Sequence, residues 1–234
     1  ILKNLTAQFK TSLDFFSDKQ FERNAVYSQE ESRYSETHRQ QYEINNELLL
    51  QYNTNFNEDF SWNLNVGGNA MFRNYERLMG YSVSGLVLPE FYNLSNSRSP
   101  AKSENFKSEK AINSIFASTT LGYKSLAYLD GTIRNDWSSS LNGKGYLYYS
   151  LTGSLILSEL VKQNWLTFSK LRLGYAKVGG DTDPYRIFDA YSFYTSLDQN
   201  HAYLLPLTKN NLDLRPEQTQ SYEAGLEASF LDNR

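Results

Sequence analysis

The sequence predicts an all-β protein, specifically a transmembrane antiparallel β-barrel, and two observations carry this prediction. About eight segments alternate apolar and polar residues, as expected of strands with one apolar and one polar face. The connections between these segments alternate between short and long. Outer-membrane barrels show this asymmetry, because their turns are short on one side of the membrane and their loops are long on the other.

The clearest strand runs from Phe60 to Arg73, and its two faces separate almost completely. One face carries Phe60, Trp62, Leu64, Val66, Ala70 and Phe72. The other carries Ser61, Asn63, Asn65, Gly67, Asn69 and Arg73, with Met71 as the apolar exception. The first face suits hydrocarbon, and the asparagine-rich face suits a watery or plug-filled lumen.

The remaining strands follow from the same alternation. Before the clearest strand, the apolar faces are Leu5, Ala7, Phe9, Leu13 and Phe15, then Ile44, Leu48, Leu50, Tyr52 and Phe56. After it come segments 114–124, 127–134 and 147–157, then Leu171–Val178 and Tyr222–Phe230. Period-two spacing and the content of tyrosine, phenylalanine, threonine and valine favour strands, although residues 43–51 also fit a helical pattern.

The lengths of the connections distinguish a membrane barrel from a soluble β fold. Those predicted to be long are Ser17–Tyr42, Tyr75–Lys110 and Gly179–Thr219, with tight turns at Asn57–Asp59 and Lys124–Ser125. Asp136–Gly145 and Glu159–Ser169 are intermediate. A soluble sandwich or barrel has no physical asymmetry between its two ends, so strict alternation favours the membrane.

Composition excludes several other classes. The 234 residues include no cysteine, so disulfides and thiolate metal sites are absent. A transmembrane helix is excluded because no run of about 18 apolar residues exists. The formal charge of -3, with acidic and basic residues interspersed, argues against nucleic-acid binding. His38 and His201 lie far apart in the sequence, which argues against a catalytic or metal site built on histidine. We therefore expect no enzymatic activity, cofactor or metal.

Three elements in the second half of the chain have a recognisable order and spacing. The first holds Arg134, Asp136, Ser138 and Ser139, and the second holds Leu171, Arg172, Tyr175, Gly179 and Gly180. The third holds Asn211, Leu214, Pro216, Glu217, Tyr222, Glu223 and Gly225. From Ile112 onward, the chain resembles the SusC/RagA-like TonB-dependent outer-membrane transporters of Bacteroidota. Trp137 and Ala176 stand where the elements of that family usually have glycine.

The resemblance implies a barrel of about 22 strands with a plugged lumen, of which this chain supplies about eight. Residues 1–234 would be part of a TonB-dependent receptor β-barrel domain, with the plug domain and signal peptide outside this sequence. The implied function is import of oligosaccharides or oligopeptides across the outer membrane of a Gram-negative bacterium. The implied partners are outer-membrane lipids, a SusD-like lipoprotein lid, the TonB system and a glycan or peptide ligand.

Two groups of candidate site residues follow. Aromatic residues in the long connections are expected to face ligand or partner: Tyr81, Phe91, Tyr92, Tyr185, Phe188, Tyr191, Phe193 and Tyr194. Polar residues are expected to face the lumen: Asn63, Asn65, Asn69, Arg73, Glu223 and Glu227. Alternatively, the aromatic residues pack the loops together or form a girdle at the membrane interface.

Three alternatives stay open at this point. A small, complete eight-stranded barrel with a structural or adhesive role would pair Leu5–Phe15 with Tyr222–Phe230. A soluble β-sandwich would serve as a binding module. A SusC-like subunit would instead be a scaffold in another envelope complex.

Overall fold

A computed structural model describes residues 4–163, 165–195 and 201–231. The elements of the first half are β1 (Leu5–Asn24), β2 (Arg33–Asn55), β3 (Phe60–Leu86), the 3₁₀ helix η1 (Leu94–Asn96) and β4 (Ser97–Tyr123). Those of the second half are β5 (Ala127–Ser138), β6 (Gly145–Ile156), α1 (Leu157–Leu160), β7 (Leu166–Gly180), β8 (Ser192–Thr195), β9 (His201–Leu204) and β10 (Glu217–Phe230).

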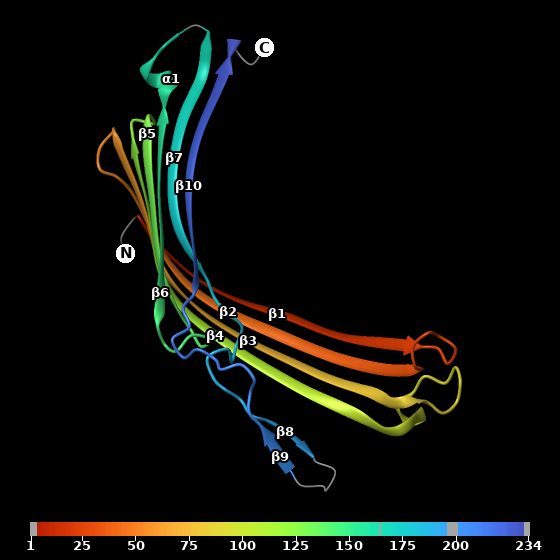
Figure 1. The fold of residues 1–234 in the computed structure, drawn as a ribbon. Coiled ribbons are helices and arrows are strands. Elements are labelled where there is room, and N and C mark those ends of the chain that lie inside the picture. The colour runs from red at the N-terminus through yellow and green to blue at the C-terminus, as the bar shows by residue number, and fades with distance from the viewer. Residues whose placement is uncertain (1–3, 164, 196–200, 232–234) are drawn as a thin grey trace. The chain divides into compact units, whose positions relative to one another are not determined.

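One eight-stranded sheet contains most of these strands, in the order β1-β2-β3-β4-β5-β6-β7-β10. Neighbouring strands of this sheet follow one another in chain order (Figure 1), and β8 and β9, which lie between β7 and β10 in the sequence, form a separate two-stranded sheet. The predicted all-β, antiparallel fold of eight main strands is confirmed. Among the described residues, no helix has the length and apolar content needed to cross a membrane.

The first strands are much longer than the sequence pattern predicts. Most of Ser17–Tyr42 and Tyr75–Lys110 is strand rather than loop, and the connections shrink to residues 25–32 and 87–96. The prediction was wrong here because it relied on apolar residues at every second position. A strand with polar residues on both faces still forms its backbone hydrogen bonds, but its sequence lacks the alternation of apolar and polar residues.

The chain divides into two compact units. The first unit contains residues 1–10, 46–70 and 111–234, and the second contains residues 11–45 and 71–110. Strands β1 to β4 each contribute one portion to each unit.

The second unit has a polar interior. The buried hydroxyl of Ser82 accepts a 2.9 Å hydrogen bond from the backbone N–H of Tyr34, and Ser32 accepts one of 2.9 Å from Leu86. Gly85 has a φ of +83°, and a Cβ there would lie 3.2 Å from the Ser32 hydroxyl, so this bend near the end of β3 requires glycine. Ion pairs join neighbouring strands, for example Arg39 Nη1 with Asp18 Oδ2 at 3.2 Å.

Tight turns link the strands of the first unit at one end. The Asn57 side chain accepts hydrogen bonds from the N–H groups of Asp59 and Phe60, each at 2.9 Å. Lys124 and Ser125 both have positive φ, as in the two-residue turns that join antiparallel strands. The alternation of connection lengths has one exception. Residues 157–165, which include α1, form a longer connection than residues 139–144.

Candidate functional site

In the first unit, strand register assigns each side chain to one of two faces, because paired residues of neighbouring strands point to the same side of the sheet. One row on the polar face runs from β4 to β10 through Thr120, Asp130, Thr152, Gly174 and Glu223. One row on the other face runs through Tyr123, Ala127, Leu155, Leu171 and Leu226. The predicted separation into an apolar and a polar face therefore continues across five strands.

The apolar face is uncovered. Leu226 is 70% exposed, Leu173 is 56% exposed and Ile133 is 50% exposed. In the part of the chain that the structure describes, the only other sheet is the short β8–β9 hairpin, so a second sandwich layer is missing. Soluble monomers rarely expose continuous apolar patches beyond a few hundred Å². This face therefore requires lipid or protein to cover it.

Aromatic pairs border the apolar face at both ends. At the end with the tight turns, the ring centroids of Phe60 and Tyr123 lie 4.7 Å apart, and those of Trp165 and Phe230 lie 5.9 Å apart. At the other end, a tyrosine row consists of Tyr149, Tyr175 and Tyr222, with centroids 5.9 and 5.0 Å apart. From Tyr222 to Phe230 a strand rises about 27 Å, or about 20 Å along the barrel axis at a tilt of about 40°. The hydrocarbon-facing band of a bacterial barrel has a height of about 25 Å between two such girdles.

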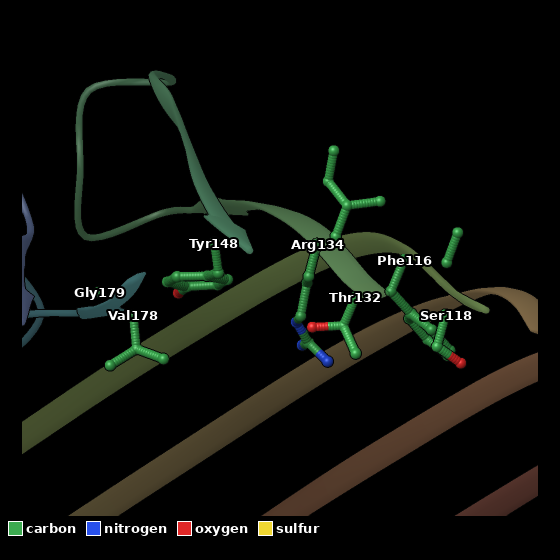
Figure 2. Close-up of a pocket in the computed structure, with 9 residues that line it drawn as sticks. Phe116, Ser118, Thr132, Arg134, Tyr148, Val178 and Gly179 are labelled. Carbon is green, nitrogen blue, oxygen red and sulfur yellow. The ribbon is translucent and has the colours of Figure 1, made fainter. Parts of the chain in front are cut away.

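The polar face has a hollow of about 430 Å³, which Figure 2 shows. Arg134 lies between the rings of Tyr148 and Phe116, the hydroxyl group of Thr132 lies near it, and Ser118 lines the hollow beside Phe116. The remaining labelled residues, Val178 and Gly179, line the hollow from β7.

Two glycines leave room for the aromatic rings of this hollow. A Cβ at Gly67 would lie 2.6 Å from Cζ of Phe116 and 2.7 Å from the carbonyl oxygen of Leu48. A Cβ at Gly179 would lie 2.8 Å from Cε1 of Tyr148. Real Cβ atoms do not approach so closely, so these positions require glycine if the rings keep their places.

Hydrogen bonds hold Arg134 in place. Its Nε donates to Oδ1 of the buried Asp136 at 2.7 Å, and its Nη2 donates to Oγ of Ser114 at 2.8 Å. Further along β5, the Ser138 hydroxyl donates to Oδ2 of Asp181 at 2.6 Å, which connects β5 to the start of the long connection 181–216. The guanidinium group, the hydroxyls and the rings form a surface that can bind a polar or anionic chain.

The predicted lumen residues lie where the strand pattern places them. The Asn65 amide donates to Ser118 Oγ on the polar face at 3.1 Å, and Asn63 and Asn69 follow the same alternation along β3. Glu223 and Glu227 lie on the polar face of β10, opposite Gly174 and Lys170. Their position next to a lumen stays a prediction.

Arg73 belongs to the second unit, where its Nη2 lies 2.7 Å from Oε2 of Glu43. Hydrogen bonds from Asn45, and then from Arg73, hold the pKa of Glu43 below its ordinary value, although burial opposes them. Arg73 is therefore part of an ion pair between β2 and β3.

Most of the predicted aromatic residues are exposed. Tyr185, Phe188 and Tyr191 follow β7, and each is more than half exposed. Phe193 in β8 is 74% exposed and pairs in register with Tyr203 of β9. The side chain of Tyr194 lies outside the described side chains.

In the second unit, Phe91 and Tyr92 lie in the connection 87–96, as expected. The loop assignment of Tyr81 was wrong, because this residue lies within β3. The Arg33 guanidinium carbon lies 5.5 Å from the centroid of the Tyr81 ring, and Arg23 lies 5.4 Å from that of Tyr92.

Sequence reasoning noted Arg134 and Gly179 only as parts of motifs and did not find the hollow that they line. Its residues come from four strands, β4 to β7, and cross-strand register brings them together. In the described residues, no group of three or more histidine, cysteine, aspartate or glutamate side chains could hold a metal ion.

Several solved structures contain a segment with a similar fold to this sheet. A chain of a structure described as the RagAB peptide transporter matches all of this chain with a TM-score of 0.83 and 20% identity. This chain has the fold of a segment of that transporter's β-barrel. Structures of the RagAB peptide importer in the "open-open" and "closed-closed" states both match with a TM-score of 0.78, at 21% and 20% identity.

The chain spans 27% of the length of each of these three transporter chains. The resemblance to SusC/RagA-like transporters, predicted from sequence motifs, is therefore confirmed at the level of fold. All three structures are described as a transporter or importer rather than an enzyme. No protein-family model and no curated relative matches the chain.

Proposed function

We propose that this chain forms part of the barrel wall of an outer-membrane nutrient importer of the SusC/RagA type. The observation that carries the proposal is the match of the entire chain to the RagAB barrel at a TM-score of 0.83. In this proposal, residues 1–234 are part of a TonB-dependent receptor barrel domain in a Gram-negative outer membrane.

The two faces of the first unit support this assignment. The apolar face, bordered by aromatic residues, would contact lipid, and the polar face would line the lumen, where the plug domain or ligand passes Arg134 and the asparagines of β3. In the second unit, the portion of β4 carries mostly polar and charged residues, so this unit would contact water rather than lipid.

The sheet order favours a segment of a larger wall over a complete small barrel. Closure of an eight-stranded barrel requires β1 to pair with β10. In the described residues, β1 pairs with β2 and β10 pairs with β7, so β1 and β10 are the two edges. Unpaired backbone groups at an edge cannot face hydrocarbon, so further strands would have to pair with them.

The substrate class in this proposal is an oligopeptide or oligosaccharide, captured beneath a SusD-like lipoprotein. The RagAB structures are described as those of a peptide importer, which favours oligopeptides. The exposed aromatic residues of the connection 181–216 would contact the ligand or lid. TonB would supply the energy through a segment outside this sequence.

An uptake experiment tests the function. Cells producing the full-length protein that contains this chain receive a fluorescent oligopeptide mixture or a fluorescent oligosaccharide mixture, with and without a protonophore. We expect accumulation of the peptides that stops when the proton gradient is removed. Accumulation of oligosaccharides alone would change the substrate class.

The matched controls are cells that lack the gene and cells that produce the protein with β5 deleted. If neither mixture enters above the level of these controls, although the intact protein is assembled in the outer membrane, the importer assignment is wrong. A scaffold role would then account for the fold.

A further inference from the structure

A second hollow, of about 290 Å³, lies where the strands meet the connections 139–144 and 205–216. Leu147, Tyr149 and Lys177 line it from β6 and β7, and Lys144, Leu214 and Arg215 line it from the connections. All of these residues belong to the first unit.

Register places this hollow on the apolar face. Tyr149 pairs directly with Lys177, and Leu147 and Leu151 flank Tyr149 at the alternate positions of β6 that share its face. Tyr149 is also a member of the tyrosine row that borders the apolar face. The hollow therefore lies at the boundary between the apolar band and the polar connections.

Positive charge dominates the hollow. Lys144 Nζ contacts Oδ1 of Asp213 at 2.7 Å, and this interaction holds the pKa of Asp213 below its ordinary value. Among the described residues, neither Lys177 nor Arg215 forms an ion pair within 4.0 Å, although the charge of Arg215 also acts weakly on Asp213. The three cations therefore outnumber the one carboxylate that interacts with them. Their long aliphatic stems can lie along apolar surface while the charged groups reach toward a polar headgroup.

We propose that this hollow binds the anionic headgroup of a membrane lipid, with Lys177 and Arg215 holding its phosphate. The acyl chains lie along Leu147 and Tyr149 and continue down the apolar face. Basic pockets at the membrane boundary attract anionic lipids by this combination of charge and adjoining apolar surface. The inference rests on the proposed contact between the apolar face and lipid.

Native mass spectrometry of the full-length protein that contains this chain tests the proposal. The detergent-purified protein receives phosphatidylglycerol or phosphatidylcholine with identical acyl chains. The wild type is expected to retain more phosphatidylglycerol than phosphatidylcholine. Since each cation near an anionic surface contributes about 1 kcal/mol, Lys177→Gln and Arg215→Gln should each lower retention about fivefold, and the double variant about 25-fold.

Two further variants keep the result interpretable. Lys162→Gln removes an exposed cation beyond the opposite end of β7, and retention should not change. Asp213→Asn removes the carboxylate beside Lys144, and retention should rise. Heat-dependent electrophoretic mobility verifies that each variant has a folded barrel.

Equal retention of the two lipids by the wild type would overturn the proposal, as would a double variant that retains as much phosphatidylglycerol as Lys162→Gln. Full displacement by inorganic phosphate would also overturn it, because a free anion would then account for the site. Peptide uptake with no lipid preference would refute this inference alone. Lipid preference without uptake would refute the importer function alone.

Discussion

Arg134 makes several contacts at the polar hollow. Its guanidinium group bonds to Asp136 and Ser114 and lies 5.8 Å from the centroid of the Phe116 ring. Only 8% of the Asp136 side chain is exposed, against 42% of the Arg134 side chain. Removing Arg134 therefore leaves a carboxylate that is buried and unpaired, which costs more than loss of the interaction itself.

We predict that Arg134→Gln destabilises the folded barrel by about 2 kcal/mol, less than a fully buried pair because Arg134 is half exposed. Adding Asp136→Asn should restore part of the loss, because it removes the unpaired charge. The measurement is the temperature at which the folded electrophoretic band of the full-length protein disappears. Arg172→Gln is the matched control, an exposed arginine with no ion pair in the described residues. An equal shift for both single variants would contradict the role of Arg134.

The protonation state of Asp213 should make phosphatidylglycerol retention depend on pH. Its pKa is lowered, first by the hydrogen bond from Lys144, then by the charge of Lys144 and, more weakly, by that of Arg215. A carboxylate with a lowered pKa keeps its ion pair above the ordinary value of 3.8 and loses the pair as the pH falls through the lowered value.

The wild type and Asp213→Asn should therefore differ in phosphatidylglycerol retention from pH 7 down to about pH 4, and the difference should close at lower pH. Native mass spectrometry across this range measures it. If the difference in retention between the wild type and Asp213→Asn disappeared between pH 7 and pH 5, a group other than Asp213 would determine the effect of Lys144.

Among the structural elements, the connection 181–216 combines anchored ends with exposed aromatic side chains. Asp181 bonds to Ser138 near its start, and Asp213 pairs with Lys144 near its end. Between these contacts, the amide of Asn210 donates to the carbonyl oxygen of Phe188 at 2.6 Å. The exposed rings are thus attached to a connection that the first unit fixes at both ends.

Replacing Tyr185, Phe188, Tyr191 and Phe193 together with alanine should weaken binding of the fluorescent peptides, or of the proposed lipoprotein partner, about tenfold or more. Aromatic side chains contribute most of the affinity at many binding surfaces. Binding to the purified protein measures the effect, and electrophoretic mobility verifies that the amount of assembled barrel is unchanged. Leu205 and Leu207 are exposed apolar residues of the same connection and supply an alanine control. Equal loss in both sets would assign the effect to the connection as a whole.

For the molecule as a whole, single cysteines introduced into these 234 residues, which contain none, can map the surroundings of each strand face. Ser150 and Leu151 are adjacent in β6 and lie on opposite faces of the sheet. Lys102 and Ser103 are adjacent in the polar portion of β4, and both are exposed.

We predict that Ser150→Cys reacts with a water-soluble maleimide, whereas Leu151→Cys reacts only with a lipid-soluble one. Lys102→Cys and Ser103→Cys should both react with the water-soluble reagent, because both faces of that part of the strand are exposed to water. Labelling rates of the full-length protein in proteoliposomes measure the four positions. Rapid water-soluble labelling of Leu151→Cys would contradict lipid contact at the apolar face.

The local alternation of residues by itself determined the number of main strands and their two faces. Phe60–Arg73 shows why: side-chain period in a strand is a property of the backbone, so the faces can be read from residue order. The tight turns at Asn57–Asp59 and Lys124–Ser125 were predictable for the same local reason. Motif order around Arg134, Gly179 and Pro216 also pointed to the family whose fold the structure then matched.

Tertiary structure alone decided how far the strands extend and which residues meet. β4 extends from Ile112 back to Ser97, because backbone pairing does not require apolar side chains. The alternation of apolar and polar residues is therefore absent where both faces of the strand are polar. The two hollows depend on register across several strands, and register is a property of the assembled sheet. Residue order shows which face Arg134 or Lys177 occupies, but only the paired strands place Arg134 beside Tyr148 and Phe116, and Lys177 beside Tyr149 and Arg215.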